Sequence, residues 1–417
     1  MNMHKRWFLS VIGLTLLLLL LWPIVNFVID PWGLNNLFRI PHVNSIKSKM
    51  EGHAKLYKIC AEKIIYPDAI ILGSSRTQQG ISTYHPGWGT SVDTVYNFAV
   101  DSASIHEISV LFHRALALRP LKKVVIGLDM FSFDVYRDDP IDLEALAACD
   151  DRIKYLKLFL TEEMTKDSYS SIAQNIYSQG PGTYILPNGQ TNPLFIADGL
   201  RRAGGHHKFF LLNERAYMKT GYLPPPRTQF GFHDAGGHST MNDLKEIIKT
   251  VRRDNIDLRL FISPVHARQL EVIRVLGLWQ TFEQWKRELV ELLAEDAAAH
   301  PSQLPIPLWD FGGYNSLTAE NLPSLDDKTT PMRWYWESSH YKQAVGDFVL
   351  DRLFDYKSPD RHVPDDFGAL INQKNVDAHL MRIRREYERY RATHGADIAE
   401  VEESYEQTRK DFVPAVK

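Results

Sequence analysis

Asp68-Ala69-Ile70-Ile71-Leu72-Gly73-Ser74-Ser75-Arg76 is the stretch that decides the fold. Its first half is a short apolar run, which is typical of a fully buried strand. A glycine and two serines follow at once, and these residues favour a turn. The stretch therefore predicts a strand that ends at Leu72 and a turn that presents Ser75 just beyond it.

Four further segments have the composition of buried strands, and helical patterns lie between them. The strand candidates are residues 94–98, 123–128, 258–262 and 307–311. Apolar residues recur at helical spacing over 104–117 and over 267–294. Alternation of strand and helix predicts an α/β fold with a parallel sheet that is covered on both faces.

Several polar or flexible residues fall directly after the predicted strands. Ligands of parallel sheets bind beyond the carboxyl ends of the strands. We therefore expect one edge of the sheet to carry Ser75, Ser102, Asp129, the segment 264–266 and the Gly312-Gly313 turn.

The N-terminus predicts a membrane anchor. Trp7 to Ile29 is apolar apart from three polar residues and is long enough to span a bilayer core of about 30 Å. His4, Lys5 and Arg6 precede it, and because positive charge stays on the cytoplasmic side, the bulk of the chain should lie outside. A cleaved signal peptide is the alternative, but no small-x-small cleavage site follows the apolar run.

Composition sets broad limits on the kind of protein. The chain has 417 residues, of which 44% are hydrophobic and 24% charged, as in a globular protein with a sizeable core. The net charge of -3 gives no indication of nucleic-acid binding. Cys60 and Cys149 are able to pair outside the cytoplasm, but the sequence leaves their pairing open. No Cys/His pattern has zinc spacing, and we expect neither a metal nor a cofactor.

The expected organisation is linear. We divide the chain into a stub and anchor (1–30), a linker with a leading helix (31–67), an α/β domain (68–356) and a charged helical extension (357–417). Within the α/β domain, residues of about 135–250 break the strand–helix alternation and predict a large helical and loop insertion. This insertion is either a lid or substrate platform, or a passive decoration.

The C-terminal extension has one apolar helix face. Val376, Leu380, Ile383, Tyr387 and Tyr390 follow 4-3-4-3 spacing. The pattern indicates a helix packed on the domain, with a coiled coil or partner-binding helix as the alternative.

A second motif with chemical meaning, Glu337-Ser338-Ser339-His340-Tyr341, stands after the last predicted strand. A serine becomes a nucleophile only beside a base, which imidazole supplies, and a carboxylate fixes the imidazole tautomer. This layout is that of a serine hydrolase or acyltransferase. Ser75 would be the nucleophile, His340 the general base and then general acid, and Glu337 the orienting carboxylate.

Four blocks of the chain resemble the SGNH/GDSL hydrolase superfamily. They are Gly73-Ser74-Ser75, the segment 97–104, Gly127-Leu128-Asp129, and Glu337 to His340. The resemblance implies a flavodoxin-like three-layer fold with the nucleophile on Ser75. It also implies that Ser102, at a glycine position of the family, contributes a backbone N–H to an oxyanion hole.

Asp129 departs from the family, which has an asparagine there as an oxyanion donor. An ionised carboxylate only accepts hydrogen bonds and would oppose a developing oxyanion. Asp129 is therefore protonated, paired with Arg76, or engaged with a substrate hydroxyl, unless it simply caps a loop. We favour the pair with Arg76, because a guanidinium and a carboxylate at neighbouring strand ends can form a bidentate contact. Arg76 is also able to direct its charge toward the oxyanion or an anionic substrate.

Three further residues are candidates for the substrate side. His266 follows a predicted strand, and its alternatives are a rival base or a structural role. Trp336 and Tyr341 flank the last block, where aromatic rings either stack on sugars or pack in the core.

The Gly-Ser-Ser variant, the His-Tyr ending and the anchor are similar to a bacterial envelope branch of the superfamily. This branch includes DltD-like proteins and proteins of exopolysaccharide O-acetylation. The resemblance implies a single-pass protein of the inner (cytoplasmic) membrane whose bulk is periplasmic. It would be a serine esterase or O-acyltransferase acting on acyl, chiefly acetyl, groups of an envelope or exported polysaccharide.

The resemblance also implies partners. The partners would be the membrane, the glycan, and a membrane-bound O-acyltransferase or export complex. The alternative is a catalytically inactive, glycan-binding or scaffolding subunit of such a complex, because Ser102 and Asp129 depart from the oxyanion-hole residues.

Overall fold

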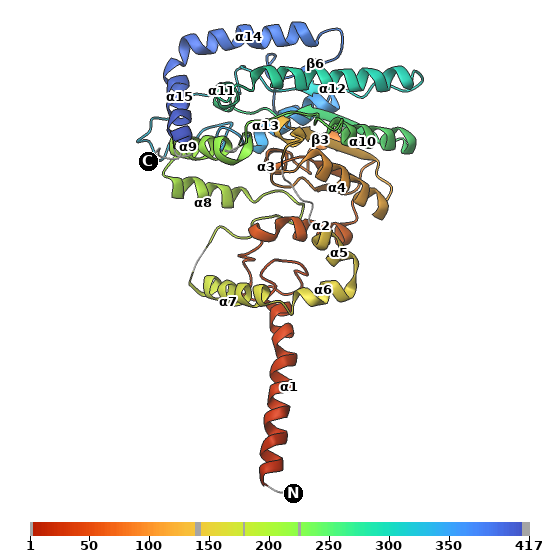
Figure 1. The fold of residues 1–417 in the computed structure, drawn as a ribbon, viewed down its shortest axis with the longest axis vertical. Coiled ribbons are helices and arrows are strands. Elements are labelled where there is room, and N and C mark those ends of the chain that lie inside the picture. The colour runs from red at the N-terminus through yellow and green to blue at the C-terminus, as the bar shows by residue number, and fades with distance from the viewer. Residues whose placement is uncertain (1–2, 138–142, 178–179, 224–226, 411–417) are drawn as a thin grey trace. The chain divides into compact units, whose positions relative to one another are not determined.

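The computed structural model describes residues 3–137, 143–177, 180–223 and 227–410 (Figure 1). The chain divides into two compact units. The first, which we call the anchor unit, comprises residues 1–64 and 140–187. The second, the sheet unit, comprises residues 65–139 and 188–417.

A mixed sheet forms the centre of the sheet unit. Its strands are β1 (Ala69–Leu72), β2 (Val95–Asn97), β3 (Lys123–Leu128), β4 (Asp257–Ile262), β5 (Leu308–Asp310) and β6 (Ala369–Ile371). They lie in the order β2-β1-β3-β4-β5-β6. The first five are parallel, and β6 runs antiparallel to β5. The parallel sheet expected from the sequence is confirmed, and β6 is an addition at its edge.

The central strands are buried on both faces. Ile71 and Val125 belong to a core cluster with Val345 and Val349 of α13 (Gln343–Phe354). Successive side chains of a strand point to opposite faces. Ile70, which points to the other face, is also fully buried. This burial explains why the strands are continuous apolar runs rather than alternating ones.

The remaining helices of the sheet unit lie between the strands and after the last one. They are α3 (Ser75–Gly80), α4 (Ile105–Leu118), α8 (Pro193–Ala203), α9 (His206–Ala216), α10 (Met241–Asp254), α11 (Ala267–Val275), α12 (Trp279–Ala299), α14 (Val376–Thr393) and α15 (Gly395–Lys410). The single helix expected over 267–294 is two helices. Gly277 separates them, and its left-handed φ of +74° is a conformation that ends helices.

The C-terminal residues belong to the sheet unit. Of the five apolar residues at 4-3-4-3 spacing, Val376, Leu380, Ile383 and Tyr390 are buried. Helix α14 packs against α12, and α15 packs against α9 and α11. The interpretation as helices packed on the domain is therefore confirmed for the described residues.

The anchor unit is helical. It contains α1 (Met3–Ile29), α2 (Ala54–Ile65), α5 (Leu143–Asp150), α6 (Arg152–Leu158) and α7 (Glu162–Tyr177). Helix α1 is long and apolar enough to cross a membrane. Cys60 of α2 and Cys149 of α5 form a disulfide, which the sequence had left open.

The two units divide the chain differently from the linear segments expected. Residues 140–187 of the expected insertion belong with the anchor, whereas residues 188–250 belong with the sheet. The leading helix expected within 31–67 is α2, which begins at Ala54.

We expect reduction of the disulfide to loosen the anchor unit. The bond closes a loop with a sequence separation of 89 residues, and its loss should lower the free energy of unfolding by about 2–4 kcal/mol. Limited proteolysis of the full chain in detergent, with and without reductant, measures this as faster cleavage within residues 143–177. In a Cys60→Ser/Cys149→Ser variant the reductant should have no further effect. Equal cleavage of the oxidised and reduced wild type would contradict the expectation.

Candidate active site

A tight turn after β1 places Ser75 at the carboxyl edge of the sheet. Gly73 has φ +144°, and a Cβ atom there would lie 2.4 Å from the Thr77 hydroxyl oxygen and 2.9 Å from the Gly127 carbonyl oxygen. Only glycine fits that space and that backbone conformation. The chain therefore enters α3 immediately, with Ser75 as its first residue.

Ser75, His340 and Glu337 form a hydrogen-bonded series. The Ser75 Oγ and His340 Nε2 atoms are 2.7 Å apart. The other ring nitrogen, Nδ1, contacts Glu337 Oε1. The second oxygen of Glu337 accepts a hydrogen bond of 2.7 Å from the Ser339 backbone N–H. This arrangement lets His340 take a proton from Ser75 while Glu337 holds the ring tautomer.

A short loop after β5 holds the two partners of Ser75. Tyr335 and Tyr341 form an antiparallel bridge across it, and the Trp336 N–H donates to the His340 carbonyl oxygen at 2.9 Å. Tyr341 is fully buried and lies directly against Gly80 of α3, where a Cβ atom would be 2.0 Å from its ring. This contact fixes the loop to the helix that begins with Ser75.

Arg76 and Asp129 form a buried ion pair beside this series. Arg76 Nη1 lies 2.7 Å from Asp129 Oδ1, and the other carboxylate oxygen accepts a 2.6 Å bond from the Ser74 hydroxyl. The pair expected from the sequence is present, but it is not bidentate: only Nη1 of Arg76 contacts Asp129, while Nε and Nη2 donate to Ser339 and Tyr222. Burial is the largest single effect and opposes the charge of Arg76, but the Asp129 carboxylate together with Tyr217 and Tyr222 outweighs it, so the pKa of Arg76 lies well above its ordinary value.

The guanidinium also reaches the loop that carries His340. Arg76 Nε donates to the Ser339 hydroxyl at 2.8 Å, and that hydroxyl donates to Tyr217 at 2.6 Å. The guanidinium carbon lies 5.1 Å from the centre of the Phe131 ring and 5.4 Å from that of Tyr217. Arg76 is only 3% exposed, so it acts as a positioning residue between the strand ends and the loop.

A cavity of about 220 Å³ opens at Ser75 and His340. Its lining residues are Ser75, Ser102, Phe131, Arg137, Asn213, Ala216, Tyr217, Thr220, Gly221 and His340. The residues of one wall come from the end of α9 and from the π-helical turn Tyr217–Gly221 that continues it. Such turns are rare and recur at functional sites.

Ser102 has the backbone conformation that a glycine would favour. Its φ is +57°, in the left-handed region that most residues avoid. The Arg137 side chain donates to its carbonyl oxygen and so fixes the neighbouring peptide. Ser75 is the first residue of α3, so its N–H has no partner within the helix. Ser75 and Ser102 both line the cavity, so their backbone N–H groups stay the candidate oxyanion donors.

The three candidates for the substrate side lie elsewhere. His266 is 1% exposed. Its Nδ1 accepts from the Arg268 N–H at 3.2 Å, and its Nε2 lies 2.7 Å from the Glu320 carbonyl oxygen. It therefore has the structural role that the sequence left open. Tyr341 is a packing residue rather than a sugar platform, because it is fully buried.

Trp336 is half-buried and not among the cavity residues. The Lys342 ammonium lies 4.6 Å from the centre of its ring.

The residues that sequence reasoning missed come mainly from α9 and the turn after it. The helical spacing of Asn213, Tyr217 and Thr220 indicates that these side chains share one polar face of a helix. Nothing in that spacing indicates that the face turns toward Ser75, because the approach of α9 to the sheet edge depends on tertiary packing.

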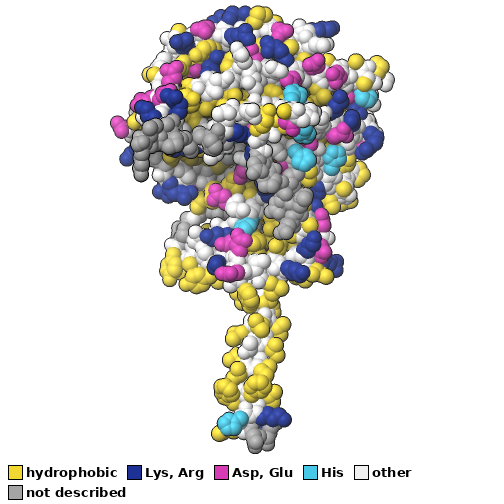
Figure 2. Space-filling view, in the orientation of Figure 1, with side chains coloured by type: hydrophobic (Ala, Val, Ile, Leu, Met, Phe, Trp, Pro, Cys, Tyr) yellow, Lys and Arg dark blue, Asp and Glu magenta, His cyan; other side chains and the backbone are white. Residues whose placement is uncertain are grey.

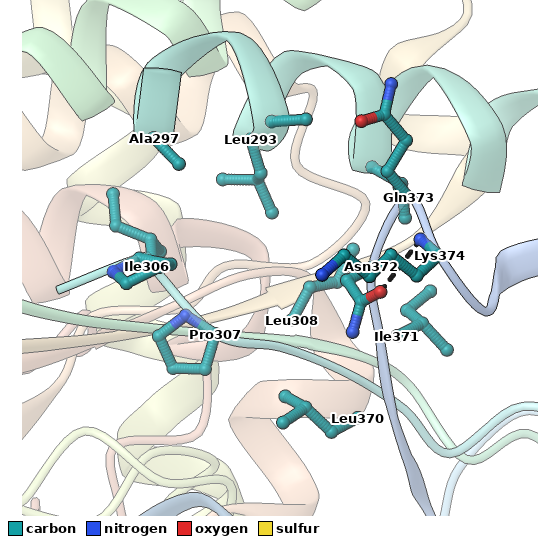
Figure 3. Close-up of a pocket in the computed structure, with 13 residues that line it drawn as sticks. Leu293, Ala297, Ile306, Pro307, Leu308, Leu370, Ile371, Asn372, Gln373 and Lys374 are labelled. Atoms are coloured by element: carbon teal, nitrogen blue, oxygen red, sulfur yellow. Dashed lines mark hydrogen bonds between the residues drawn. The ribbon is translucent and has the colours of Figure 1, made fainter. Parts of the chain in front are cut away.

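Two other features could hold ligands. His53, Glu163 and Asp167 of the anchor unit offer ligand atoms within 4.8 Å of one another. A larger cavity of about 480 Å³ lies where α12 faces the start of β5 and the end of β6 (Figure 3). Side chains such as Leu293, Leu308 and Ile371 make this second cavity apolar, and it lies at the opposite edge of the sheet from Ser75.

Comparison with known proteins adds no family assignment: no protein-family model and no curated protein sequence matches the chain.

Replacement of Asp129 by asparagine is expected to destabilise the sheet unit. The variant leaves the buried Arg76 guanidinium without its counter-charge, which costs about 3–5 kcal/mol. Urea unfolding of the full chain in detergent measures the loss. An Arg76→Met/Asp129→Asn variant should recover part of it, and the exposed control Asp360→Asn should change little. A loss no larger in Asp129→Asn than in Asp360→Asn would show that the pair contributes nothing.

His266 is expected to make the fold acid-sensitive. Burial lowers its pKa from 6.5 to about 3, so below about pH 6.5 the unfolded chain takes up a proton that the folded chain does not. The contribution to stability is intact above that pH and falls by about 1.4 kcal/mol for each pH unit toward pH 3. Urea unfolding between these limits should show a shallower decline for His266→Gln than for wild type. The exposed control His238→Gln should keep the wild-type slope, and an unchanged slope in His266→Gln would refute this role.

Proposed function

We propose that this chain is a membrane-anchored, extracytoplasmic serine esterase or O-acyltransferase of the SGNH type. Its substrates would be acyl, chiefly acetyl, esters of a cell-envelope or exported polysaccharide. The observation that carries the proposal is the 2.7 Å separation of Ser75 Oγ and His340 Nε2, with the Glu337 carboxylate on the other ring nitrogen.

The position of the site in the sheet supports the SGNH assignment. The order β2-β1-β3-β4-β5 is that of flavodoxin-like doubly wound sheets, whose ligands bind where the strand order reverses, between the first and third strands. Ser75 follows β1 and Asp129 follows β3. The nucleophile and the ion pair therefore occupy the switch point that the resemblance leads one to expect.

The mechanism follows from the series of hydrogen bonds. His340 Nε2 takes the Ser75 proton as Oγ attacks the ester carbonyl carbon, and the carbonyl π electrons move to oxygen. The N–H groups of Ser75 and Ser102 would stabilise that oxyanion. When the tetrahedral species collapses, the bond to the alcohol oxygen breaks, His340 returns its proton to the departing alcohol, and the acyl group stays on Ser75.

The second half of the reaction decides between the two activities. His340 deprotonates either water or a sugar hydroxyl, whose oxygen attacks the acyl-Ser75 carbonyl. Collapse expels Ser75 Oγ, which recovers the proton from His340. Water gives a free acid, and a sugar hydroxyl gives a new ester. The cavity of about 220 Å³ suits a small acyl group, and Asn213 and Thr220 at its wall offer hydrogen bonds to hydroxyls.

The compartment is supported by two features of the anchor unit. His4, Lys5 and Arg6 precede the apolar part of α1, which favours a cytoplasmic N-terminus. The Cys60–Cys149 disulfide favours an oxidising compartment for the rest. We propose the inner membrane of a bacterium with a periplasmic catalytic unit, and a membrane-bound O-acyltransferase or export complex as partner.

One observation favours a second candidate, an inactive glycan-binding or scaffolding subunit. Asp129 stands where the family has an amide donor, and both of its oxygens are engaged by Arg76 and Ser74. The hole would then lack its side-chain donor. Loss of one such donor costs about 10²–10³ in rate, so residual activity is still expected if the series Ser75–His340–Glu337 operates.

A fluorophosphonate probe distinguishes the two candidates. The phosphonyl phosphorus accepts Ser75 Oγ and loses fluoride, so an activated Ser75 should be labelled in membranes that contain the full chain. Ser75→Ala should abolish labelling, and His340→Gln should slow it by at least about 10³ because the base is lost. The exposed control Ser91→Ala should label like wild type. An unlabelled wild type, or equal labelling of Ser75→Ala, would exclude Ser75 as the nucleophile and leave the scaffold as the better account.

A further inference from the structure

Helix α6 of the anchor unit exposes an apolar stripe. Ile153, Leu156 and Leu160 are 65%, 58% and 48% exposed. Their spacing of three and four residues puts them on one face of the helix and of the turn that follows it. Large apolar side chains that gather in one place on a surface mark a contact with another molecule or a membrane.

Two more segments of the same unit add to this surface. Tyr169, Ile176 and Tyr177 of α7 are 79%, 54% and 88% exposed. In the segment 37–40, Leu37, Phe38 and Ile40 are exposed by 67%, 42% and 41%. Figure 2 shows hydrophobic side chains gathered along the rim of this unit from which α1 emerges.

Hydrogen bonds fix these segments at one level of α1. Asn26 of α1 donates to the Phe159 carbonyl oxygen after α6 and to the Thr165 hydroxyl of α7, each at 2.9 Å. Trp22, one turn earlier, also donates to Thr165. The segment 37–40 is tied to the same end of α1, because Asn44 donates to the carbonyl oxygens of both Val28 and Phe38. Figure 1 shows α6 and α7 on either side of this end of α1.

That level is where a bilayer would end. A helix rises 1.5 Å per residue, so a hydrocarbon core of about 30 Å takes about 20 residues. Counted from Trp7, the first residue after the basic N-terminal group, the core ends close to Asn26. Trp22 stands one turn inside that boundary, and tryptophan is enriched at membrane interfaces.

Charge indicates the kind of lipid. Arg152, Lys154 and Lys157 are exposed on α6 between its apolar residues. Asp151, the acidic residue next to them, is held at the helix start, where it accepts from the Ile153 and Lys154 N–H groups. On α7, Glu162 pairs with Lys166. Helix α6 therefore combines an apolar stripe with a net positive charge, as helices that lie in anionic membrane surfaces do.

We propose that α6, the exposed face of α7 and the segment 37–40 form a collar around α1 that lies in the headgroup region of the outer leaflet, with α6 binding anionic phospholipid. The collar holds the anchor unit against the bilayer surface, so that α1 is not its only contact with the membrane. The proposal rests on α1 spanning the membrane and is independent of the chemistry at Ser75.

The depth of single side chains in a bilayer tests the collar. The full chain is reconstituted into vesicles of phosphatidylcholine and phosphatidylglycerol, with a nitroxide on Leu156→Cys or Tyr177→Cys. Power-saturation spectra compare collisions with oxygen, which concentrates in the bilayer, and with a water-soluble nickel chelate. We expect both labels to favour oxygen, whereas a control label on Leu304→Cys, an 88% exposed residue of the sheet unit, should favour nickel.

Lipid selectivity tests the charge. Spin-labelled phosphatidylglycerol should be immobilised by the wild type several-fold more than spin-labelled phosphatidylcholine. Arg152→Gln/Lys154→Gln/Lys157→Gln should bring the two lipids to the same level, while Lys208→Gln, a basic residue of the sheet unit, should not.

Three outcomes would overturn the proposal. Nickel access at Leu156 and Tyr177 equal to that at Leu304 would show that the collar stands in water. Dipolar broadening between labels on two molecules would show that a second copy of the chain covers it. A shielded collar without preference for phosphatidylglycerol would remove the anionic lipid from the proposal.

Discussion

The ion pair of Arg76 and Asp129 joins the parts of the molecule on which the candidate site depends. Asp129 follows β3, Arg76 lies in the first turn after β1, and the guanidinium reaches Ser339 in the loop that carries His340. Both charges are almost completely buried. A buried pair of this kind contributes little net stability over apolar packing, but removal of one partner is costly. The pair is therefore better understood as a device that fixes three chain segments in one arrangement than as a source of folding energy.

The same neighbourhood shows why the Ser75 turn has the sequence it has. Gly73 is required by its backbone angle and by the closeness of Thr77 and Gly127. Ser74 is the N-cap of α3: its hydroxyl accepts a hydrogen bond from the Arg76 N–H and donates one to Asp129. Each residue of the turn thus has a separate structural reason, and Ser75 alone extends its side chain toward an imidazole. The half-buried state of Ser75 and His340 fits a pair that must meet a substrate.

The sequence predicted most of the sheet because its parallel strands are continuous apolar runs. Ala69–Leu72 and Lys123–Leu128 were delimited to the residue, since a charged or turn residue follows each run. Strand β6 could not be predicted. A strand of three residues is too short to show a periodic pattern, and β6 forms only by pairing with β5 at the edge of the sheet. The boundary between the units could not be predicted either. Residues 140–187 join the anchor unit through tertiary contacts and a disulfide, and the sequence separation of two cysteines does not indicate whether they lie close together in space.

At the candidate site, the sequence predicted the contacts that follow from the chemistry of the residue types. It did not predict the positions that depend on tertiary packing. Ser75, His340 and Glu337 are brought together as their residue types suggested. The Arg76–Asp129 pair followed from charge balance. His266, by contrast, stands after a strand like Ser75, yet it turns inward to cap α11, and no local signal separates the two cases.

The pairing of Asp129 bears directly on whether the proposed chemistry can operate. A lone carboxylate near the developing oxyanion would raise the barrier, since the two negative charges repel. Arg76 neutralises Asp129 at 2.7 Å, and a neutral pair has a much weaker field at a third point than a single charge has. The backbone N–H groups of Ser75 and Ser102 would then face the oxyanion without an opposing charge from Asp129. On this account the arginine that follows the proposed nucleophile would make an aspartate tolerable where SGNH/GDSL proteins have an asparagine.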